Sequence, residues 1–441
     1  KPRISTGIDD PLYVKTIVLE SMGRKLAYVI FDLIALEKKQ GDKGIMIASE
    51  KTGIPPENIV WAASHTHTGP YTTRLLSDDT PINHDWLATI PEKMAECIIA
   101  ADREKRAAKF CRLRSFHNGL CHNRRIKFKN GTAINTWLLP NAPSDQQPIG
   151  SAGPIDPEIG IFSFDDENGK LMAVMFHFTL HTNTNFGPRF SADYPAVVAA
   201  RIRERFGPEV ITLFIPGACG DINLTCGGYR QTGDALAEKI IPSLEIRKPE
   251  ETPLYLKAKK CEITVPRRDF TSNQIERILK SGWDIESQKV FIKEMETMSK
   301  EGKKQDDTIL QTWCIGNTGF ASLPGEIFVE WGLKIKRESP FSYTYPVEIG
   351  GDYLGYLITE QAWEEGGYEA LIAQSAKPSA SGVRIMVEKS LEMLGNLHKD
   401  YLMANGIRLD EKTGRWIFPF YLFPLGQAIL GFSLPLGKKR K

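Results

Sequence analysis

Histidine is concentrated in one part of this chain of 441 residues, in a pattern that could bind a metal ion. Seven of the eight histidines lie in the first half of the chain: His65, His67, His84, His117, His122, His177 and His181. The closest pair, His65 and His67, stands in the string S-H-T-H-T-G-P, directly after the apolar run N-I-V-W-A-A. Residues two apart in an extended segment face the same side, so both imidazoles can point into one cleft, where one binds a metal and the other holds a proton. Two surface histidines beside a Gly-Pro turn are an equally good interpretation of this string alone.

Two further strings hold groups that could complete such a site. In F-H-F-T-L-H-T-N-T the residues before His181 read as a strand, so we expect only one of its two histidines in the site, and His177, between two phenylalanines, to be structural. In L-P-G-E, Glu326 is predicted to open a helix that runs to about Arg337, and capping of that helix is its alternative role. Two imidazoles and a carboxylate on separate elements are enough for a catalytic zinc ion with an open position for water.

Strands that alternate with helices must position these groups. Apolar runs rich in β-branched residues predict strands over 12–19, 26–34, 58–63, 172–178, 210–215 and 255–265. Amphipathic runs predict helices over 85–105, 194–206, 232–244 and 272–300. A stretch rich in Pro, Gly, Ser and Asp predicts a loop over 140–157, and an exposed stretch predicts a linker over 299–307. This alternation predicts an α/β fold.

The composition is that of a folded globular protein and argues against nucleic acid as a partner. The 56 basic and 54 acidic residues are interspersed, so no field of one sign is present to bind a polyanion. Seven cysteines without a C-x-x-C pair argue against a disulfide scaffold and a cysteine zinc ribbon. Cysteine usage is compatible with the cytoplasm, and removal of a targeting segment would be compatible with a secreted, periplasmic or membrane-associated protein. The sequence therefore leaves the location and the oligomeric state open.

The C-terminal tail, residues 401–441, contains twenty uncharged residues from Ile417 to Leu436 and a basic end, K-K-R-K. The length of this run suits a membrane span. Three prolines within it argue against a regular helix, because each removes a backbone donor that lipid could not replace. We weigh contact of the tail with a membrane surface against packing on the body of the protein or on a partner, the second being favoured.

Six motifs that occur in one order resemble the neutral/alkaline ceramidase family. They are H-T-H-T-G-P, H-N-R-R (His122–Arg125), F-T-L-H-T-N-T, G-A-C-G-D-I-N (Gly217–Asn223), L-P-G-E, and G-D-Y-L-G-Y with Y-E-A downstream. The resemblance begins at D-D-P-L-Y-V-K and covers nearly the whole chain. It implies an α/β catalytic domain over residues 1–400, with mixed β-sheets, flanking helices and a subregion boundary near 245–310. Larger members add an immunoglobulin-like domain, which we expect to be absent here because too few residues follow Tyr368 for a sandwich of about 100.

The resemblance also implies a function and a set of site residues. The family cleaves the amide bond of N-acylsphingosine, a sphingolipid, with a zinc ion, so a lipid or related small molecule is the implied substrate. By motif, the zinc ligands fall on His65, His181, Glu326 and Tyr356, and further active-site residues on His67, Arg124 and Tyr368. His67 suits protonation of a leaving amine, and Arg124 and Tyr368 suit donation to a developing oxyanion. A surface salt bridge is the alternative role for Arg124.

One position departs from the family pattern. The serine of the family string G-D-V-S corresponds to Asn223 in G-D-I-N. An amide can donate and accept hydrogen bonds and so orient a substrate, but it cannot act as a nucleophile. The departure excludes a mechanism that depends on that serine and favours attack by zinc-activated water. It leaves open a hydrolase of another amide or ester, or a non-catalytic zinc- or ligand-binding protein.

Overall fold

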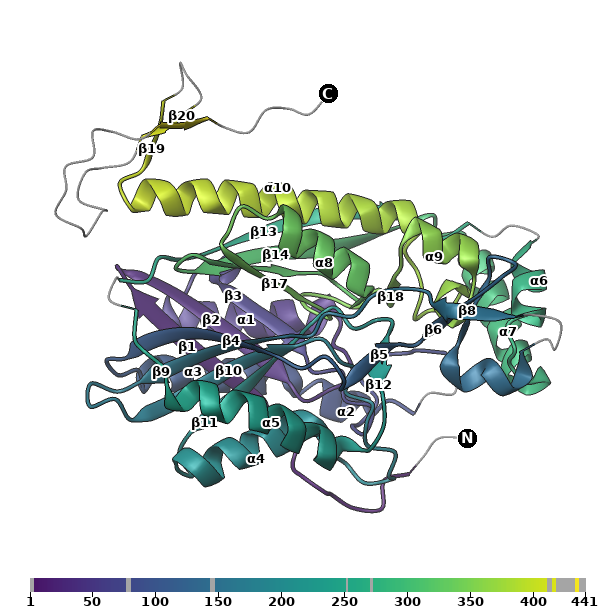
Figure 1. Ribbon diagram of the computed structural model, residues 1–441, viewed down its shortest axis with the longest axis horizontal. Coiled ribbons are helices and arrows are strands. Elements are labelled where there is room, and N and C mark those ends of the chain that lie inside the picture. Colours follow the sequence, from purple (N-terminus) through teal and green to yellow (C-terminus); the bar gives the residue numbers. More distant parts are fainter. Residues whose placement is uncertain are drawn as a thin grey trace.

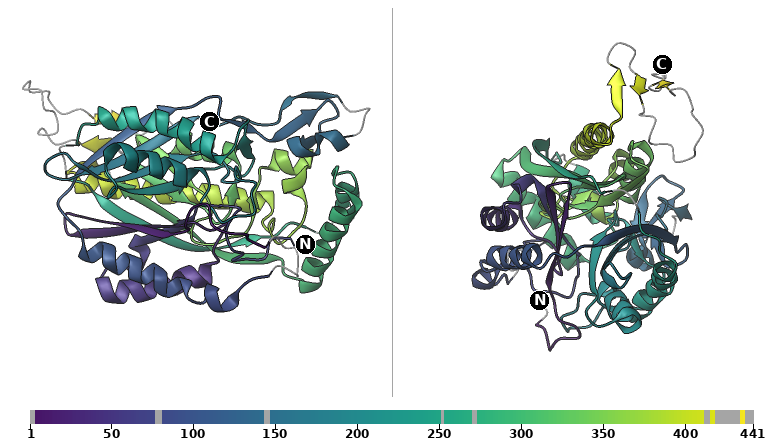
Figure 2. Two further views of the ribbon diagram at one scale, coloured as in Figure 1. Left: turned by 90° about the horizontal axis from the view of Figure 1, so that it is seen from below. Right: turned by 90° about the vertical axis from the view of Figure 1, so that its left-hand side faces the viewer.

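Three β-sheets carry helices on their outer faces and pack against one another on their inner faces (Figures 1 and 2). The computed structural model describes residues 4–76, 81–142, 147–250, 253–269, 273–410, 415–417 and 433–435. Each sheet contains a pair of parallel strands, and the loops that leave these strands converge on one region of the molecule.

The first sheet has the order β1-β2-β3, with β1 and β2 antiparallel and β2 and β3 parallel. Strand β2 is apolar without alternation and is buried from Leu26 onward, as expected for a strand covered on both faces. Helices α1 and α3 cover the outer face through an apolar stripe that in α3 includes Ile90, Met94 and Ile98. The elements are β1 (Val14–Ser21), β2 (Arg24–Phe31), β3 (Ile59–Ala63), α1 (Lys38–Thr52), α2 (His84–Leu87), α3 (Ile90–Arg103) and the 3₁₀ helix η1 (Pro56–Asn58).

The second sheet has the order β11-β10-β9-β4 and carries helices α4 and α5 on its outer face (Figure 1). Strands β10 and β11 are parallel, and their connection runs through α4. The elements are β4 (Lys109–Phe116), β9 (Glu158–Asp165), β10 (Leu171–Phe178), β11 (Ile211–Pro216), α4 (Tyr194–Phe206) and α5 (Tyr229–Glu245).

The third sheet has the order β13-β14-β15-β17, with α10 lying along it in Figure 1 and α8 connecting the parallel strands β15 and β17. Strands β13 and β14 pair along their full length, and α6 and α7 are inserted between them in the sequence. The elements are β13 (Leu256–Pro266), β14 (Gln305–Ile315), β15 (Thr318–Ser322), β17 (Tyr343–Val347), α6 (Asn273–Leu279), α7 (Ile285–Glu301), α8 (Val329–Glu338) and α10 (Ala380–Ala404).

Aromatic side chains fill the core where the three sheets meet. Tyr28 of the first sheet lies against Trp313 of the third, with ring centroids 6.0 Å apart. Phe162 of the second sheet lies 5.5 Å from Phe320 of the third. Burial of rings of this size contributes most of the packing energy of such a core. The sheets are therefore fixed relative to one another, and so are the loops at their ends.

The carboxyl ends of strands β3, β10, β11, β15 and β17 lead into loops that contact one another. Backbone hydrogen bonds join these loops across the sheets: His67 N to Thr182 O (3.2 Å), Gly220 N to Ile327 O (2.8 Å) and Glu348 N to Pro216 O (3.1 Å). The two histidine strings and L-P-G-E stand in these loops. Ligand sites of α/β proteins form in such a place, outside the carboxyl ends of parallel strands.

Short elements complete the chain around these loops. They are β5 (Cys121–Asn123) paired with β12 (Ile222–Leu224), β16 (Glu326–Ile327) paired with β18 (Tyr356–Leu357), the sheet β7-β6-β8 (Ala133–Asn135, Arg125–Phe128 and Pro148–Ser151), the sheet β19-β20-β21 (Arg408–Asp410, Arg415–Ile417 and Ser433–Pro435), α9 (Glu360–Glu365), η2 (Thr136–Asn141) and η3 (Tyr368–Ala370).

The predicted helix start at Glu326 is wrong. Glu326 lies in strand β16, because its backbone N–H donates to Gly355 O (3.0 Å) and the segment pairs with β18. Helix α8 begins at Val329, whose N–H donates to the side chain of Asp221 at 2.8 Å. The acid that caps this helix thus comes from another element, and Glu326 is free for a different role.

Two predicted helices are broken and two predicted loops are shorter than expected. The run 85–105 forms α2 and α3, and the run 272–300 forms α6 and α7, separated near Gly282, whose φ is +81°. Residues 140–157 include strand β8, and the expected linker 299–307 contains the end of α7 and the start of β14. Asp306 is buried there because Arg267 binds both of its carboxylate oxygens.

Apart from Ile417 and the strand Ser433–Pro435, the apolar run 417–436 of the tail lies outside the described residues. None of the helices in the described part of the chain is both long and apolar enough to cross a membrane.

Candidate metal centre

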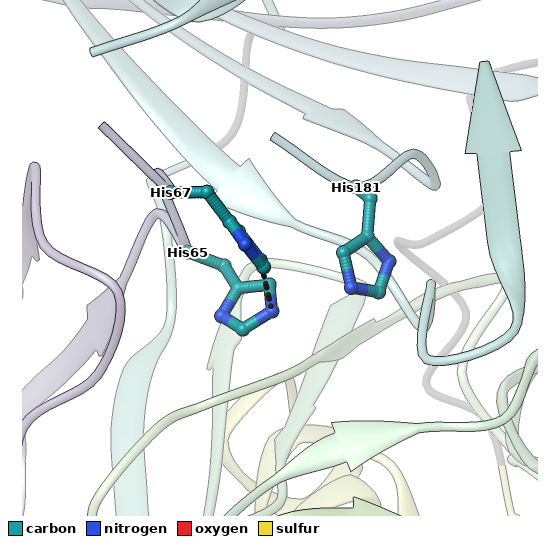
Figure 3. A group of neighbouring side chains, drawn as sticks. All are labelled: His65, His67 and His181. Atoms are coloured by element: carbon teal, nitrogen blue, oxygen red, sulfur yellow. Dashed lines mark hydrogen bonds between the residues drawn. The ribbon is translucent and has the colours of Figure 1, made fainter. Parts of the chain in front are cut away.

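Three histidines lie together in the loops after β3 and β10 (Figure 3). One ring nitrogen of each of His65, His67 and His181 lies within 4.8 Å of the others. The ring of His65 is 4.7 Å from that of His67 and 4.8 Å from that of His181, centroid to centroid. His65 adopts a left-handed backbone conformation, with φ of +66°, rather than the extended one the sequence predicted. The two imidazoles still meet, with their Nε2 atoms 3.2 Å apart.

Backbone carbonyls fix two of the rings from behind. His65 Nδ1 lies 2.8 Å from Ile34 O, and His181 Nδ1 lies 2.7 Å from Cys219 O. A carbonyl can only accept, so each Nδ1 carries a proton, and each ring in its neutral form presents the lone pair of its Nε2 to the site. This is the usual outer-shell arrangement of histidines that bind metals.

Glu326 brings a carboxylate to the same point. Its Oε2 lies 3.3 Å from His65 Nε2 and 3.3 Å from His181 Nε2, and its Oε1 accepts a hydrogen bond from Tyr353 at 2.7 Å. The backbone approaches closely on both sides of it. A Cβ at Gly325 would lie 2.2 Å from Gly355 O, and a Cβ at Gly220 would lie 2.5 Å from Glu326 O, so both glycines are required for the strand pairing that places Glu326.

Glu326 Oε2 is buried and has no hydrogen-bond donor among the described residues. Two Nε2 lone pairs and this oxygen therefore converge without a proton between them, unless His65 is protonated. Burial alone would lower the pKa of His65, but the charge of Glu326 raises it, and the same pair holds the pKa of Glu326 well below its usual value against the effect of burial. Burial and the charge of Arg124 lower the pKa of His181 to about 4. The site thus needs a positive charge, which either a proton or a metal ion can supply.

His67 faces the open side of the centre. It is exposed and lines a cavity of about 260 Å³ between the loops 66–71 and 183–190. Partial removal of its ring from water by the surrounding protein, followed by the charges of His65 and His181, holds the pKa of His67 well below its usual value. Although water reaches the residue, its imidazole is therefore neutral at physiological pH and able to accept a proton.

Arg124 makes several hydrogen bonds in a buried polar network beside the histidines. Its Nε donates to Glu369 Oε1 at 2.8 Å and its Nη2 to the hydroxyl of Tyr356 at 3.1 Å. Its Nη1 lies 3.3 Å from Asn223 Oδ1 and 3.5 Å from His181 Nε2. Arg124 is buried, so the alternative of a surface salt bridge is wrong. Most of its donors are occupied by the protein, so it supplies mainly a fixed positive charge.

Two tyrosines adjoin this network. The hydroxyl of Tyr356 is held by Arg124, and the ring of Tyr356 lies 5.5 Å from that of Tyr368. Burial, followed by the charge of Glu326, raises the pKa of Tyr356 well above its usual value, and the same two causes raise the pKa of Tyr368 to about 12. Both phenols are thus protonated donors in the absence of a metal. The ring of Tyr368 packs against Trp137 and Trp283, at 6.0 and 5.7 Å.

Asn223 is half-buried on strand β12, opposite His122 of strand β5. Arg124 has only donors, so the amide oxygen of Asn223 must be the atom that faces it. The amide Nδ2 is left to donate elsewhere. The structure therefore brings all eight predicted site residues into one neighbourhood, with Asn223 and Tyr356 reaching it through Arg124.

His177 is not part of the centre, as predicted: its Nε2 contacts Pro346 O at 2.9 Å in the core. Sequence reasoning missed Tyr353, which binds Glu326, and Glu369, which binds Arg124 and Arg125. Both stand within or beside strings already singled out, three residues before Tyr356 and one after Tyr368, so proximity in the sequence was the available signal.

Ceramidases are among the solved structures that share this fold. Neutral ceramidase from Pseudomonas aeruginosa superposes with a TM-score of 0.67 at 16% sequence identity, over 89% of this chain and 70% of that chain. A ceramidase complexed with C2 superposes with a TM-score of 0.65 at 16% identity, over 90% of this chain and 71% of that chain. Neither a protein-family model nor a curated protein matches the sequence. The predicted mixed α/β, ceramidase-like fold is thereby confirmed.

Proposed function

We propose that this protein is a zinc-dependent amidohydrolase that cleaves the amide bond of an N-acyl lipid or a related N-acyl compound. The observation that carries the proposal is the convergence of His65 Nε2, His181 Nε2 and Glu326 Oε2, with both Nδ1 atoms tied to carbonyls and Oε2 lacking a donor among the described residues. The likeness of the fold to ceramidases supports the same reaction class.

The donor set fits zinc. Two imidazole nitrogens and one carboxylate oxygen are ligands that catalytic zinc sites use, and such sites leave a position open. Tyr356 is the proposed fourth ligand, by the resemblance of its motif. Bound here, the ion would act as a Lewis acid that polarises the substrate carbonyl and makes a water molecule acidic enough to attack it near neutral pH.

The remaining residues have roles that follow from their hydrogen bonds. His67, which faces the open side of the centre, accepts the proton of the attacking water and then donates it to the leaving nitrogen, which departs as an amine. Tyr368 donates from its hydroxyl to the carbonyl oxygen as that oxygen becomes negative, and the buried charge of Arg124 stabilises it. Asn223 donates from Nδ2 and so orients the substrate.

One observation keeps a second substrate class open. Arg124 holds the oxygen of Asn223, so this residue offers the substrate a donor only, whereas a serine hydroxyl both donates and accepts. A substrate other than ceramide, such as an acyl group linked to a sugar or a peptide, is the competing candidate.

A substrate panel on protein of defined metal content tests the proposal. Purified protein is assayed at neutral and alkaline pH on long-chain N-acylsphingosine, short polar amides and esters, as isolated, after chelation, and after zinc is restored. We expect amide hydrolysis that chelation abolishes and zinc restores. His181→Ala should lose zinc and activity together, and the exposed His84→Ala, outside the centre, should lose neither.

The outcomes separate the alternatives. Activity on short polar amides alone would refute the ceramide-like substrate and leave the metal centre intact. Stoichiometric zinc without turnover on any amide or ester would indicate a binding protein instead. A protein that never holds zinc would refute the proposal entirely.

A further inference from the structure

A second carboxylate lies behind the centre and has no evident role in the proposed reaction. Glu348 directly follows strand β17 and is completely buried. Within the described residues, no lysine or arginine forms an ion pair with it, and its hydrogen-bond donors both belong to one residue. A buried carboxylate without a lysine or arginine partner is costly, and such groups concentrate at functional sites.

That one residue is Cys219. Its backbone N–H donates to Glu348 Oε2 at 3.0 Å, and its Sγ–H donates to Glu348 Oε1 at 2.9 Å. The carbonyl of Cys219 in turn accepts from His181 Nδ1 at 2.7 Å. A continuous chain of hydrogen bonds therefore runs from Glu348 through Cys219 to His181, whose Nε2 faces Glu326.

The backbone around Glu348 is held in a strained form that also reaches the His65 loop. The next residue, Ile349, has φ of +51°, a strained conformation that β-branched residues rarely adopt. Its carbonyl accepts from Ala63 N at 3.0 Å, two residues before His65. Backbone strain persists only where the surrounding structure enforces it, and strained residues are concentrated at functional sites.

Charge balance gives Glu348 a second role. A divalent ion held by two neutral imidazoles and Glu326 would leave one uncompensated positive charge in a buried site. Arg124 does not alter this sum, because Arg124 and Arg125 together are paired with Glu369 and Glu365. Burial raises the pKa of Glu348 to about 7, and a divalent cation bound nearby would favour its ionised form. The charge of that form would offset the remaining positive charge, which is the favourable state in a medium of low dielectric constant.

We propose that Glu348 is a positioning residue for the metal centre, which orients His181 through Cys219 and balances the charge of a divalent cation. This inference rests on the proposed function, since it requires that a metal binds at His65, His181 and Glu326. It assigns to Glu348 an effect on metal affinity rather than contact with the substrate.

Zinc affinity of the Glu348→Gln variant tests the inference. The amide keeps the size of the side chain and one acceptor for Cys219 N, but it removes the charge. Competition with a chromophoric chelator at pH 8 should give an affinity roughly ten- to a hundredfold weaker than that of the unmodified protein. The metal-free variant should be at least as stable as the unmodified protein, because a buried charge has been removed. Cobalt-loaded protein should show shifted d–d absorption bands, since the orientation of His181 changes.

Asp221→Asn is the matched control. Asp221 is also a buried carboxylate of the string G-A-C-G-D-I-N, but it binds Val329 N and Asn123 and has no bond to a proposed ligand. Its loss should leave the zinc affinity and the cobalt spectrum unchanged.

The result that overturns the inference alone is a Glu348→Gln variant that binds zinc as tightly as the unmodified protein, or one that loses affinity only as much as Asp221→Asn does. If Glu348→Gln does not fold, Glu348→Asp decides in its place. The shorter carboxylate cannot make both bonds to Cys219, so reduced affinity supports the inference and unchanged affinity overturns it. No zinc binding by the unmodified protein would instead refute the proposed function, and this inference with it.

Discussion

Substitutions of Asn223 test whether its side chain donates a hydrogen bond that orients the substrate. Its Oδ1 is bound by Arg124 at 3.3 Å, which leaves Nδ2 as the group that can donate to the substrate. Removing one donor that orients a substrate carbonyl should cost about 1–3 kcal/mol, or roughly ten- to a hundredfold in rate. The cost to the fold should be small, because Arg124 keeps its bonds to Glu369 at 2.8 Å and Tyr356 at 3.1 Å.

Three substitutions at this position should rank in a fixed order. Asn223→Ser keeps a donor and should be the most active variant, with a changed substrate preference. Asn223→Ala loses the donor and should fall roughly ten- to a hundredfold in rate. Asn223→Asp keeps an acceptor for Arg124 but places a negative charge beside the developing oxyanion, so it should be the least active.

Steady-state kinetics on the best amide substrate, with zinc content measured for each variant, provides the assay. Loss of an interaction that forms only in the transition state lowers kcat. Loss of an interaction that forms equally in the bound substrate and in the transition state raises KM and leaves kcat unchanged. All three variants should keep their zinc. An alanine variant as active as the unmodified protein would refute the donor role. An aspartate variant as active as the alanine variant would refute the placement of this side chain beside the developing oxyanion. An alanine variant as inactive as zinc-free protein would show that Asn223 takes part in the chemistry, which attack by zinc-activated water does not require.

Three further predictions concern buried acidic and phenolic residues around the centre. Tyr353→Phe removes the hydrogen bond to Glu326 Oε1 and should weaken zinc binding roughly tenfold or more in a chelator competition, and unchanged affinity would count against a ligand role for Glu326. Glu369→Gln leaves the buried Arg124 and Arg125 without their shared carboxylate and should cost about 3–5 kcal/mol in the free energy of unfolding measured in urea, whereas a loss below about 1 kcal/mol would contradict the network. Burial raises the pKa of Asp221 to about 7. Between about pH 4 and 7 the folded protein therefore binds one proton more than the unfolded chain does at this residue. The stability that this proton contributes is lost as the pH rises through that range. Asp221→Asn should therefore become more stable relative to the unmodified protein by about 4 kcal/mol between pH 4 and 8 in urea titrations, and a difference that does not vary with pH would exclude the raised pKa.

The sequence predicted the elements whose signal is local. Helix α4 was predicted with its observed bounds, and β10 and β11 to within one residue, because apolar periodicity and capping act over a few neighbours. The two short breaks, at Ala88 and Gly282, were missed because the flanking residues still favour helix. Glu326 was placed in the wrong element for a different reason: its strand is two residues long and exists only because Tyr356 pairs with it.

The site residues also differ in whether a local sequence pattern could predict them. His65, His67 and His181 stand in strings whose residue types indicate metal chemistry, and the structure brings them together. Tyr356, Arg124 and Tyr368 came from the resemblance to a family alone. Glu348 was not predicted, because nothing in E-I-G-G reveals that Cys219, 129 residues earlier, supplies both of its hydrogen bonds. Contacts of this range follow from the packing of the three sheets, which a local pattern does not determine.

The central claim is that His65, His181 and Glu326 bind a zinc ion. Diffraction data collected from crystals of the zinc-loaded protein above and below the zinc absorption edge test it most directly, because the anomalous difference map locates the element itself. We expect one strong peak about 2.0–2.2 Å from His65 Nε2, His181 Nε2 and a carboxylate oxygen of Glu326, and no such peak in crystals of Glu326→Ala. A peak elsewhere, or none at this position in protein that carries stoichiometric zinc, would contradict the claim.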